Sequence, residues 1–108
     1  MKLPTEIFGE VVVVHTPEEI SEEHTPLLAN VLTSLERTNV VVDLDGTESI
    51  DSHGLCLLRD AQDSLRLAGG DLRISTMNTY NRKILEITRL DQSLEVFESV
   101  LEAVKSFT

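Results

Sequence analysis

The sequence predicts an α/β fold, a mixed β-sheet of about four to five strands flanked by about four helices. A chain of 108 residues is expected to form a single domain, residues 1–108. Short β-branched runs, typical of buried strands, alternate with segments whose apolar residues have helical spacing. Where strands and helices alternate like this, the helices pack on the sheet and parallel strands are joined by right-handed crossovers.

The first elements are predicted to be two strands. Ile7 and Phe8 precede a run of four valines, Val11 to Val14, and Gly9 between them suits a turn. Pro17 ends the second strand because proline has no backbone N–H to donate to a sheet. The chain therefore begins with a hairpin or strand pair.

A helix follows, and its first residue lies between Ser21 and Pro26. Ser21 is a good N-cap, whereas Thr25 is a second possible cap that would place Pro26 at the first helical position. The sequence leaves both starts open. The helix presents one apolar stripe to the core, formed by Leu27, Leu28, Val31, Leu32 and Leu35.

The central strand is Val40 to Leu44, and after a loop a helix runs to Ala68. Gly69 and Gly70 supply the left-handed residue with which helices commonly end. On the helix, spacing predicts a buried face of Leu58, Ala61, Leu65 and Ala68. The predicted solvent face consists of Arg59, Asp60, Gln62, Asp63 and Arg66.

Three shorter elements complete the chain. Leu72 and Ile74 alternate as the next strand. Residues 78–88 form a short helix, with Ile84, Leu85 and Ile87 facing inward. Residues 93–97 form a last strand, and Val100, Leu101 and Val104 lie on a C-terminal helix.

Composition restricts the function classes. A formal net charge of −10, from 19 acidic and 9 basic residues, disfavours nucleic-acid binding. Cys56 is the single cysteine, so no intrachain disulfide can form, and we expect it to be a small buried apolar residue of a cytoplasmic protein. No apolar run approaches the ~20 residues that cross a bilayer, so we expect a soluble, unprocessed protein without membrane insertion.

The segment Asp51-Ser52-His53-Gly54-Leu55 lies where a loop meets the long helix. A serine that begins a helix can accept a hydrogen bond from an orphan backbone N–H. A phosphate on that serine would meet the positive end of the helix dipole. Ser52 is therefore either a cap or a switch.

Residues 41–47, Val-Val-Asp-Leu-Asp-Gly-Thr, resemble the opening motif of the haloacid dehalogenase superfamily of phosphotransferases. That resemblance would make Asp43 the nucleophile and Asp45 the acid/base beside Mg²⁺. However, 42 residues precede Asp43, and no acidic pair ends an apolar strand after Ser75. A small phosphatase is therefore the less favoured alternative to an Asp-rich turn.

Two other sets of residues fail as sites. A calcium loop starting at Asp43 would need glycine sixth and glutamate twelfth, but its glycine is fourth and its twelfth residue is Gly54. The ligands of that loop would have been Asp43, Asp45, Thr47 and Asp51. Adjacent residues at a helix start point in different directions, so Asp51-Ser52-His53 does not form a hydrolytic triad. We expect no metal and no cofactor.

The order and spacing of several segments resemble the STAS-domain family, of the anti-sigma-factor antagonist type. The segments are Val40 to Leu44, Ile50 to Leu55, Ala68-Gly69-Gly70, Leu72 to Ser75 and Arg82 to Leu90. The resemblance covers at least residues 40–104, and the aspartate-serine-x-glycine-leucine core is its most diagnostic part. It implies a mixed sheet flanked by helices and no enzymatic activity.

The resemblance also implies a function. An unphosphorylated antagonist binds an anti-sigma factor that is also a serine kinase; phosphorylation of Ser52 ends the binding, and a serine phosphatase restores it. We expect a monomer when free, with partner contacts at Thr47, Glu48, Ser49, Asp51, Ser52, His53, Gly54 and Leu55. His53 departs from the small hydroxyl residue common at its position. The alternative is a non-switching STAS subunit of a stressosome-like or lipid-transport assembly.

Overall fold

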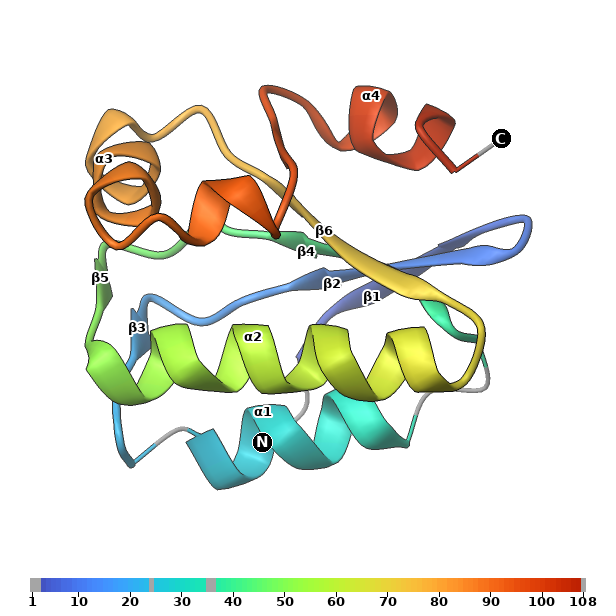
Figure 1. Cartoon of the computed structure of the whole chain (residues 1–108), viewed down its shortest axis with the longest axis horizontal. Coiled ribbons are helices and arrows are strands. Elements are labelled where there is room, and N and C mark those ends of the chain that lie inside the picture. The colour runs from blue at the N-terminus through green and yellow to red at the C-terminus, as the bar shows by residue number, and fades with distance from the viewer. Residues whose placement is uncertain (1–2, 24, 35–36, 108) are drawn as a thin grey trace.

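The computed structural model describes residues 3–23, 25–34 and 37–107. Figure 1 shows a central sheet with helices on both sides. In chain order the elements are β1 (Thr5–Phe8), β2 (Val11–His15), β3 (Glu19–Ile20), α1 (Thr25–Thr33), β4 (Asn39–Asp43), β5 (Ser49–Ile50), α2 (Ser52–Leu67), β6 (Asp71–Ser75), α3 (Thr79–Ile87), the 3₁₀ turn η1 (Leu90–Gln92), β7 (Val96–Phe97) and α4 (Val100–Lys105).

The main sheet has the strand order β1-β2-β4-β6-β7. β1 is antiparallel to β2, whereas the β2–β4, β4–β6 and β6–β7 pairs are parallel. A separate two-stranded parallel sheet joins β3 to β5 beside the start of α2. The predicted mixed α/β fold is therefore confirmed.

The valines of the central strands divide between two cores because neighbouring residues of a strand point to opposite faces. Val12, Val14, Val40 and Val42 face α1 and α2, where they pack with Leu28 and Leu58 among others. Val11, Val13 and Val41 face α4 and pack around Ala103. The two helical layers on either side of the sheet in Figure 1 follow from this alternation.

Local signals in the sequence set most of the boundaries. Gly9 turns the β1–β2 hairpin at φ +62°, and Gly69 follows α2 at φ +91°, both in the left-handed region that favours glycine. α1 starts at Thr25, which places Pro26 in its first turn and decides between the two predicted starts. In the predicted stripe of α1, Leu28 and Leu32 are buried, whereas Leu35 lies outside the described residues.

Gln62, which was predicted to face solvent, is buried. Its side-chain amide donates to the Leu72 carbonyl at 3.3 Å and the Ser93 carbonyl at 2.7 Å. Those acceptors lie on β6 and just after η1, so they cover a side of α2 that the apolar spacing had assigned to water. Ala68, predicted to be on the buried face, instead caps the end of α2 and is exposed.

Two predictions in the last third of the chain are also wrong. Ile87 is 72% exposed because α3 packs on the molecule with only one side, on which Leu85 is fully buried. The predicted strand over residues 93–97 is reduced to Val96–Phe97, because the preceding residues form η1 and a turn in which Leu94 donates back to the Leu90 carbonyl at 2.7 Å.

Candidate functional site

The start of α2 is capped by Asp51, not by Ser52. Asp51 has an extended backbone, and its Oδ1 accepts a hydrogen bond from the Gly54 amide at 3.0 Å. Its Oδ2 accepts from the Glu22 amide at 3.1 Å, which ties the segment after β3 to the helix start. The Gly54 hydrogen bond is the main reason that the pKa of Asp51 is lowered.

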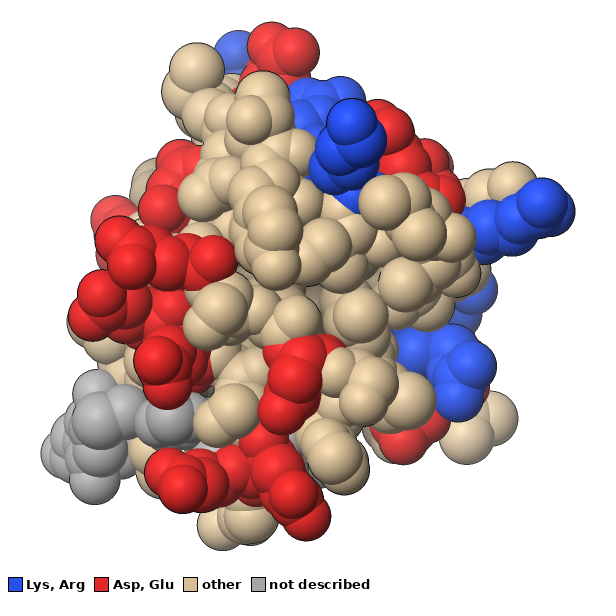
Figure 2. Space-filling model, turned by 90° about the vertical axis from the view of Figure 1, so that its left-hand side faces the viewer, with Lys and Arg blue, Asp and Glu red and all other residues tan. Residues whose placement is uncertain are grey.

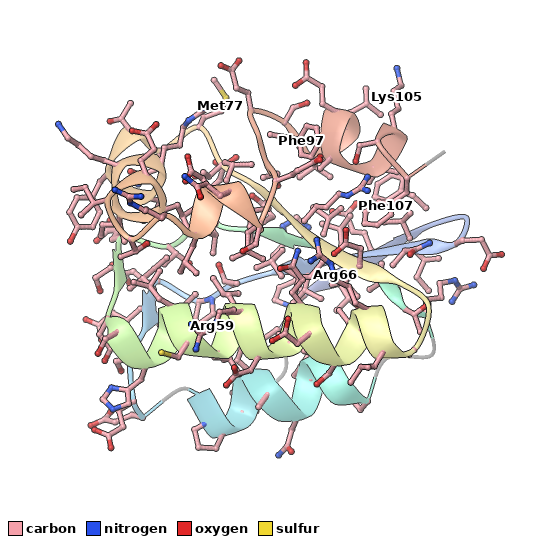
Figure 3. The ribbon with its side chains drawn as sticks, viewed as in Figure 1. Arg59, Arg66, Met77, Phe97, Lys105 and Phe107 are labelled. Atoms are coloured by element: carbon pink, nitrogen blue, oxygen red, sulfur yellow. The ribbon has the colours of Figure 1, made fainter. Side chains whose placement is uncertain are left out.

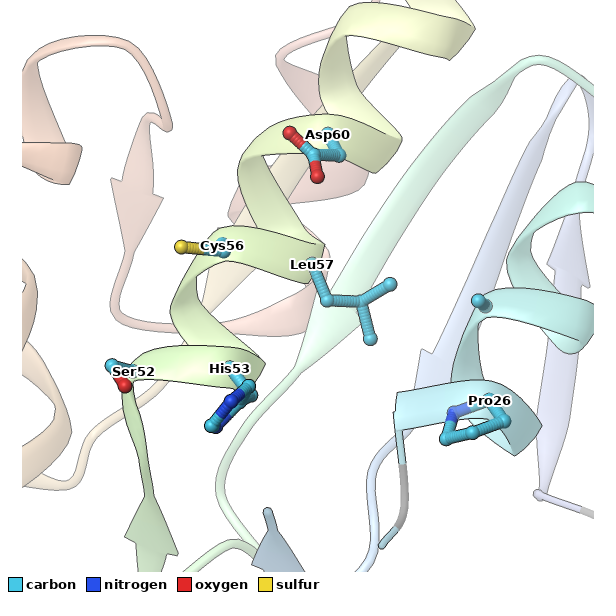
Figure 4. Close-up of a pocket in the computed structure, with 7 residues that line it drawn as sticks. Pro26, Ser52, His53, Cys56, Leu57 and Asp60 are labelled. Atoms are coloured by element: carbon cyan, nitrogen blue, oxygen red, sulfur yellow. The ribbon is translucent and has the colours of Figure 1, made fainter. Parts of the chain in front are cut away.

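Ser52 is therefore left with an uncommitted hydroxyl. It is the first residue of α2 and is exposed, and its Oγ makes no hydrogen bond within residues 3–23, 25–34 and 37–107. Ser52 lines an open hollow of about 520 Å³ between α1 and α2, together with Pro26, Ala29, His53, Cys56, Leu57 and Asp60. Figure 4 shows Leu57 projecting from α2 toward α1, on which Pro26 lies.

Gly54 allows α2 to lie against the small β3–β5 sheet. A Cβ at position 54 would come within 2.6 Å of the Ile20 side chain, 2.8 Å of the Ile20 carbonyl and 3.0 Å of the Ile50 side chain. Real Cβ atoms do not approach other atoms this closely, so the glycine is needed for packing and not for an unusual φ angle. This close packing fixes the position of the start of α2, and therefore of Ser52, relative to the small sheet.

A buried polar cluster fixes the loop between β4 and β5. The Thr47 hydroxyl donates to the Pro17 carbonyl at 2.5 Å, and Thr47 is fully buried. Asn81 of α3 is also fully buried, and its Nδ2 donates to the carbonyls of Leu44 at 3.1 Å and Thr47 at 2.8 Å. Asn81 was not among the residues predicted to belong to the site. A polar residue at a position one helical turn before Leu85 on the inward side of α3 was the available signal.

The eight residues predicted to contact a partner divide into two groups. Exposed residues are Glu48, Ser49, Asp51, Ser52 and His53. Buried residues are Thr47, Gly54 and Leu55. The five exposed residues lie together at the end of the molecule where α2 begins, and the three buried residues lie beneath this surface.

The two aspartates of the haloacid-dehalogenase-like motif have structural contacts. Asp43 ends β4, and its carboxylate accepts from the His15 ring at 2.7 Å and from the Asp45 amide at 3.0 Å. Asp45 is exposed, and its Oδ1 accepts from the Met77 amide at 2.6 Å. Both carboxylates therefore join the loops that follow neighbouring strands, as an Asp-rich turn would.

Cys56 is exposed, which corrects the prediction that it is a buried apolar residue. It lies one helical turn after Ser52, and positions four apart share a face of a helix. Its thiol points away from Pro26 of α1 in Figure 4. The leucines that flank Cys56 in the sequence suggested burial, but helical rotation places Leu55 and Leu58, and not Cys56, in the core.

His15 is expected to make folding stability depend on pH. Partial burial alone would lower the pKa of His15, but hydrogen bonds to Glu6 and Asp43 outweigh it and raise the pKa above its ordinary value of 6.5. A raised histidine pKa stabilises the fold fully below pH 6.5, and this contribution disappears as the pH rises through the folded-state value. Urea unfolding at several pH values above 6 should show this decline, and His15→Gln should remove it. Identical pH dependence in both proteins would contradict the assignment.

The model of the STAS domain family matches residues 2–103. The chain therefore belongs to the STAS-domain family, as the sequence resemblance predicted. Comparison with curated proteins by sequence gave no match.

Three solved structures have the same fold. A putative anti-sigma factor antagonist from Thermotoga maritima is 23% identical, with a TM-score of 0.86 over 96% of this chain and 92% of its own. An anti-sigma factor antagonist from Mycobacterium paratuberculosis is 21% identical, with a TM-score of 0.86 over 97% of this chain and 92% of its own. SpoIIAA of Bacillus in its phosphorylated form is 15% identical, with a TM-score of 0.74 over 99% of this chain and 100% of its own.

At these identities the likeness concerns the fold. The chain is a STAS domain whose fold resembles that of anti-sigma factor antagonists. Among the described residues, none of the helices has the length and apolar character required to span a bilayer.

Proposed function

We propose that this protein is a non-enzymatic regulatory module of the bacterial cytoplasm that binds an anti-sigma factor with serine kinase activity and is released when Ser52 is phosphorylated. The observation that carries the proposal is the exposed Ser52 hydroxyl, which Asp51 frees from capping. An uncommitted hydroxyl at a rigid helix start can enter the active site of another protein without unfolding this one. A serine phosphatase would reverse the modification.

The surface around Ser52 suits a protein partner. Figure 2 views the end of the molecule that carries β3, β5 and the start of α2, and shows a broad uncharged area with most carboxylates to its left and below it and with lysines and arginines above it and to its right. The exposed carboxylates in β3 and in the segments adjoining β3 and β5 are Glu18, Glu19, Glu22, Glu23, Glu48 and Asp51. The acidic side would steer a partner of complementary charge, and the uncharged area gives the partner a surface to cover.

Phosphorylation would change this surface without unfolding the domain. The γ-phosphoryl group of ATP leaves ADP and forms an ester with Ser52 Oγ, while the hydroxyl proton passes to the base of the kinase. The product adds about −1.5 to −2 charge next to Asp51. The N-terminal amides of α2 favour a negative charge, by about 0.3–1 kcal/mol, so the fold tolerates the phosphate. A partner packed over Ser52 would have to bury that hydrated charge and would lose affinity.

Incubation with the cognate kinase and ATP is expected to add one phosphate to the wild-type protein and none to Ser52→Ala, as measured by intact-protein mass spectrometry. Ser49→Ala is the matched control, because Ser49 is an exposed serine on β5 three residues earlier, and it should accept one phosphate normally. The phosphorylated protein should bind the kinase at least about tenfold more weakly than the unmodified one. Phosphate on Ser49, or equal affinity of both forms, would contradict the proposal.

The non-switching alternative makes a different prediction in the same assay. A STAS subunit of a stressosome-like or lipid-transport assembly would bind its partner equally well as Ser52→Ala and as Ser52→Asp. The switching module should bind as Ser52→Ala and bind poorly as Ser52→Asp. The haloacid-dehalogenase alternative requires Mg²⁺-dependent phosphatase activity that disappears in Asp43→Asn.

A further inference from the structure

Ser52 lies between two hollows that differ in charge. The larger, toward α1, contains the Asp60 carboxylate. The smaller, about 200 Å³, lies where α2 meets the segment that joins α3 to η1, and Arg59 is among the residues that line it. It is lined by Ser52, Leu55, Cys56, Arg59, Thr88 and Leu90. A phosphate attached to the Ser52 hydroxyl would therefore have a hollow lined by an acidic residue on one side and a hollow lined by a basic residue on the other.

Arg59 differs in its contacts from two other arginines, Arg66 and Arg73. Its side chain is exposed and forms no ion pair or hydrogen bond within the part of the chain that the structure describes. By contrast, Arg66 and Arg73, both at least partly exposed, are each paired with Asp71. A guanidinium left without a partner beside a proposed phosphoacceptor is free to bind an added anion.

Helix geometry brings Arg59 toward Ser52. The two residues are seven apart, which places them on one face of α2 with about 10.5 Å of rise between them. Side chains on a helix tilt toward its N-terminus, so a side chain as long as that of Arg59 can extend back past position 56 toward Ser52. The phosphate of a phosphoserine at position 52 would have to turn toward Arg59 to meet it, and the hollow that both residues line has a volume of about 200 Å³.

We infer that Arg59 and this smaller hollow form an internal receiver for the phosphate on Ser52. This inference rests on the proposed function, because it assigns a place to the phosphate which that function requires. Arginine suits the role because its planar guanidinium can donate two parallel hydrogen bonds to phosphate oxygens. Thr88 borders the hollow but its hydroxyl already donates to the Ile84 carbonyl at 2.7 Å, so Arg59 is the donor.

The receiver would direct the phosphate toward α3 and away from the hollow that faces α1. The modified domain would thereby keep its new charge at a defined place on its own surface. The guanidinium would also favour the dianionic phosphate, so the second ionisation would occur at lower pH than without Arg59. A partner would meet a full dianion at neutral pH.

The test measures the phosphate directly. Phosphoserine is placed at position 52 during translation, by an expanded genetic code, in the full chain, and the second ionisation is followed by ³¹P NMR. In Arg59→Gln the phosphate pKa should be higher than in the otherwise unchanged phosphoprotein by about 0.3–0.7 unit. Arg59→Lys should recover part of that difference.

Lys105→Gln is the charge-matched control, because Lys105 lies on α4 on the far side of the sheet from Arg59 (Figure 3). It should shift the phosphate pKa by less than about 0.1 unit, since charges more than a Debye length apart are screened. The other charged or titratable residues on the segments that border the hollow and Ser52 are the same in every variant: Asp51, His53, Cys56, Asp60, Asp63, Glu86, Arg89 and Asp91. The difference between wild type and Arg59→Gln thus reports Arg59 alone.

An equal phosphate pKa in the wild-type and Arg59→Gln proteins would overturn the receiver. Arg59→Gln is expected to fold, because glutamine has nearly the helix propensity of arginine and the position is exposed. Since the phosphoserine is installed without a kinase, failure of the kinase assay would count against the proposed function and leave this measurement intact. If Arg59→Gln does not change the phosphate pKa, the receiver is contradicted, but the proposed phosphorylation switch is not.

Discussion

Asn81→Asp is expected to lower the unfolding free energy by about 3–5 kcal/mol at pH 8, because it places an unpaired carboxylate in the interior. The Asn81 amide donates to the carbonyls of Leu44 and Thr47, and an aspartate would face these two oxygens with a negative oxygen. Burial and the carbonyl dipoles would raise the pKa of the new carboxyl group. Its destabilising effect should therefore be small near pH 4 and grow as the pH rises. Urea unfolding at both pH values measures it.

Asn78→Asp is the control on the same helix. The Asn78 side chain caps α3 by accepting from the Tyr80 amide at 2.9 Å and the Asn81 amide at 3.3 Å, and a carboxylate can accept the same hydrogen bonds. We expect this variant to change stability by less than about 1 kcal/mol. Equal losses in the two variants would show that Asn81 does not clamp the loop between β4 and β5.

Gly54→Ala is expected to lower the unfolding free energy by about 2 kcal/mol, because its methyl group would overlap Ile20 of β3. The Ile20 carbonyl, 2.8 Å from the new Cβ, belongs to the backbone and cannot move aside by changing rotamer. Alanine normally strengthens a helix by up to about 1 kcal/mol over glycine, so a net loss would show that the clash outweighs propensity. Chemical denaturation measures the loss.

Gly46→Ala provides the comparison for this second prediction. A Cβ at position 46 would meet only the Thr16 carbonyl, at 3.7 Å, which is ordinary contact. This variant should unfold within about 0.5 kcal/mol of wild type. Should Gly54→Ala be as stable as Gly46→Ala, α2 would not lie as close to the β3–β5 sheet as the structure indicates.

The sequence predicted the architecture where local patterns carry the information. Valine runs mark strands, because β-branched residues fit a sheet buried on both faces. Gly9 and Gly69 mark turns, because left-handed backbone favours glycine. These signals require only neighbouring residues, so element order could be read without knowing how the chain folds back.

The burial of particular side chains could not be predicted in the same way. Gln62, Cys56 and Ile87 were each misassigned because burial depends on which elements cover each side of a helix. β6 and the turn after η1 cover Gln62, whereas α3 leaves Ile87 at the surface. These contacts join segments that are far apart in the chain, so helical spacing cannot predict them.

The candidate site shows the same division. The motif from Asp51 to Leu55, and the position of Ser52 at the start of a helix, follow from the sequence because capping chemistry and helical spacing are local. That Asp51 takes the capping role, bonded to both Gly54 and Glu22, emerged only from the folded chain. The same is true of Asn81 beneath the loop, since the carbonyls that it contacts are brought near by the packing of α3 and not by sequence proximity.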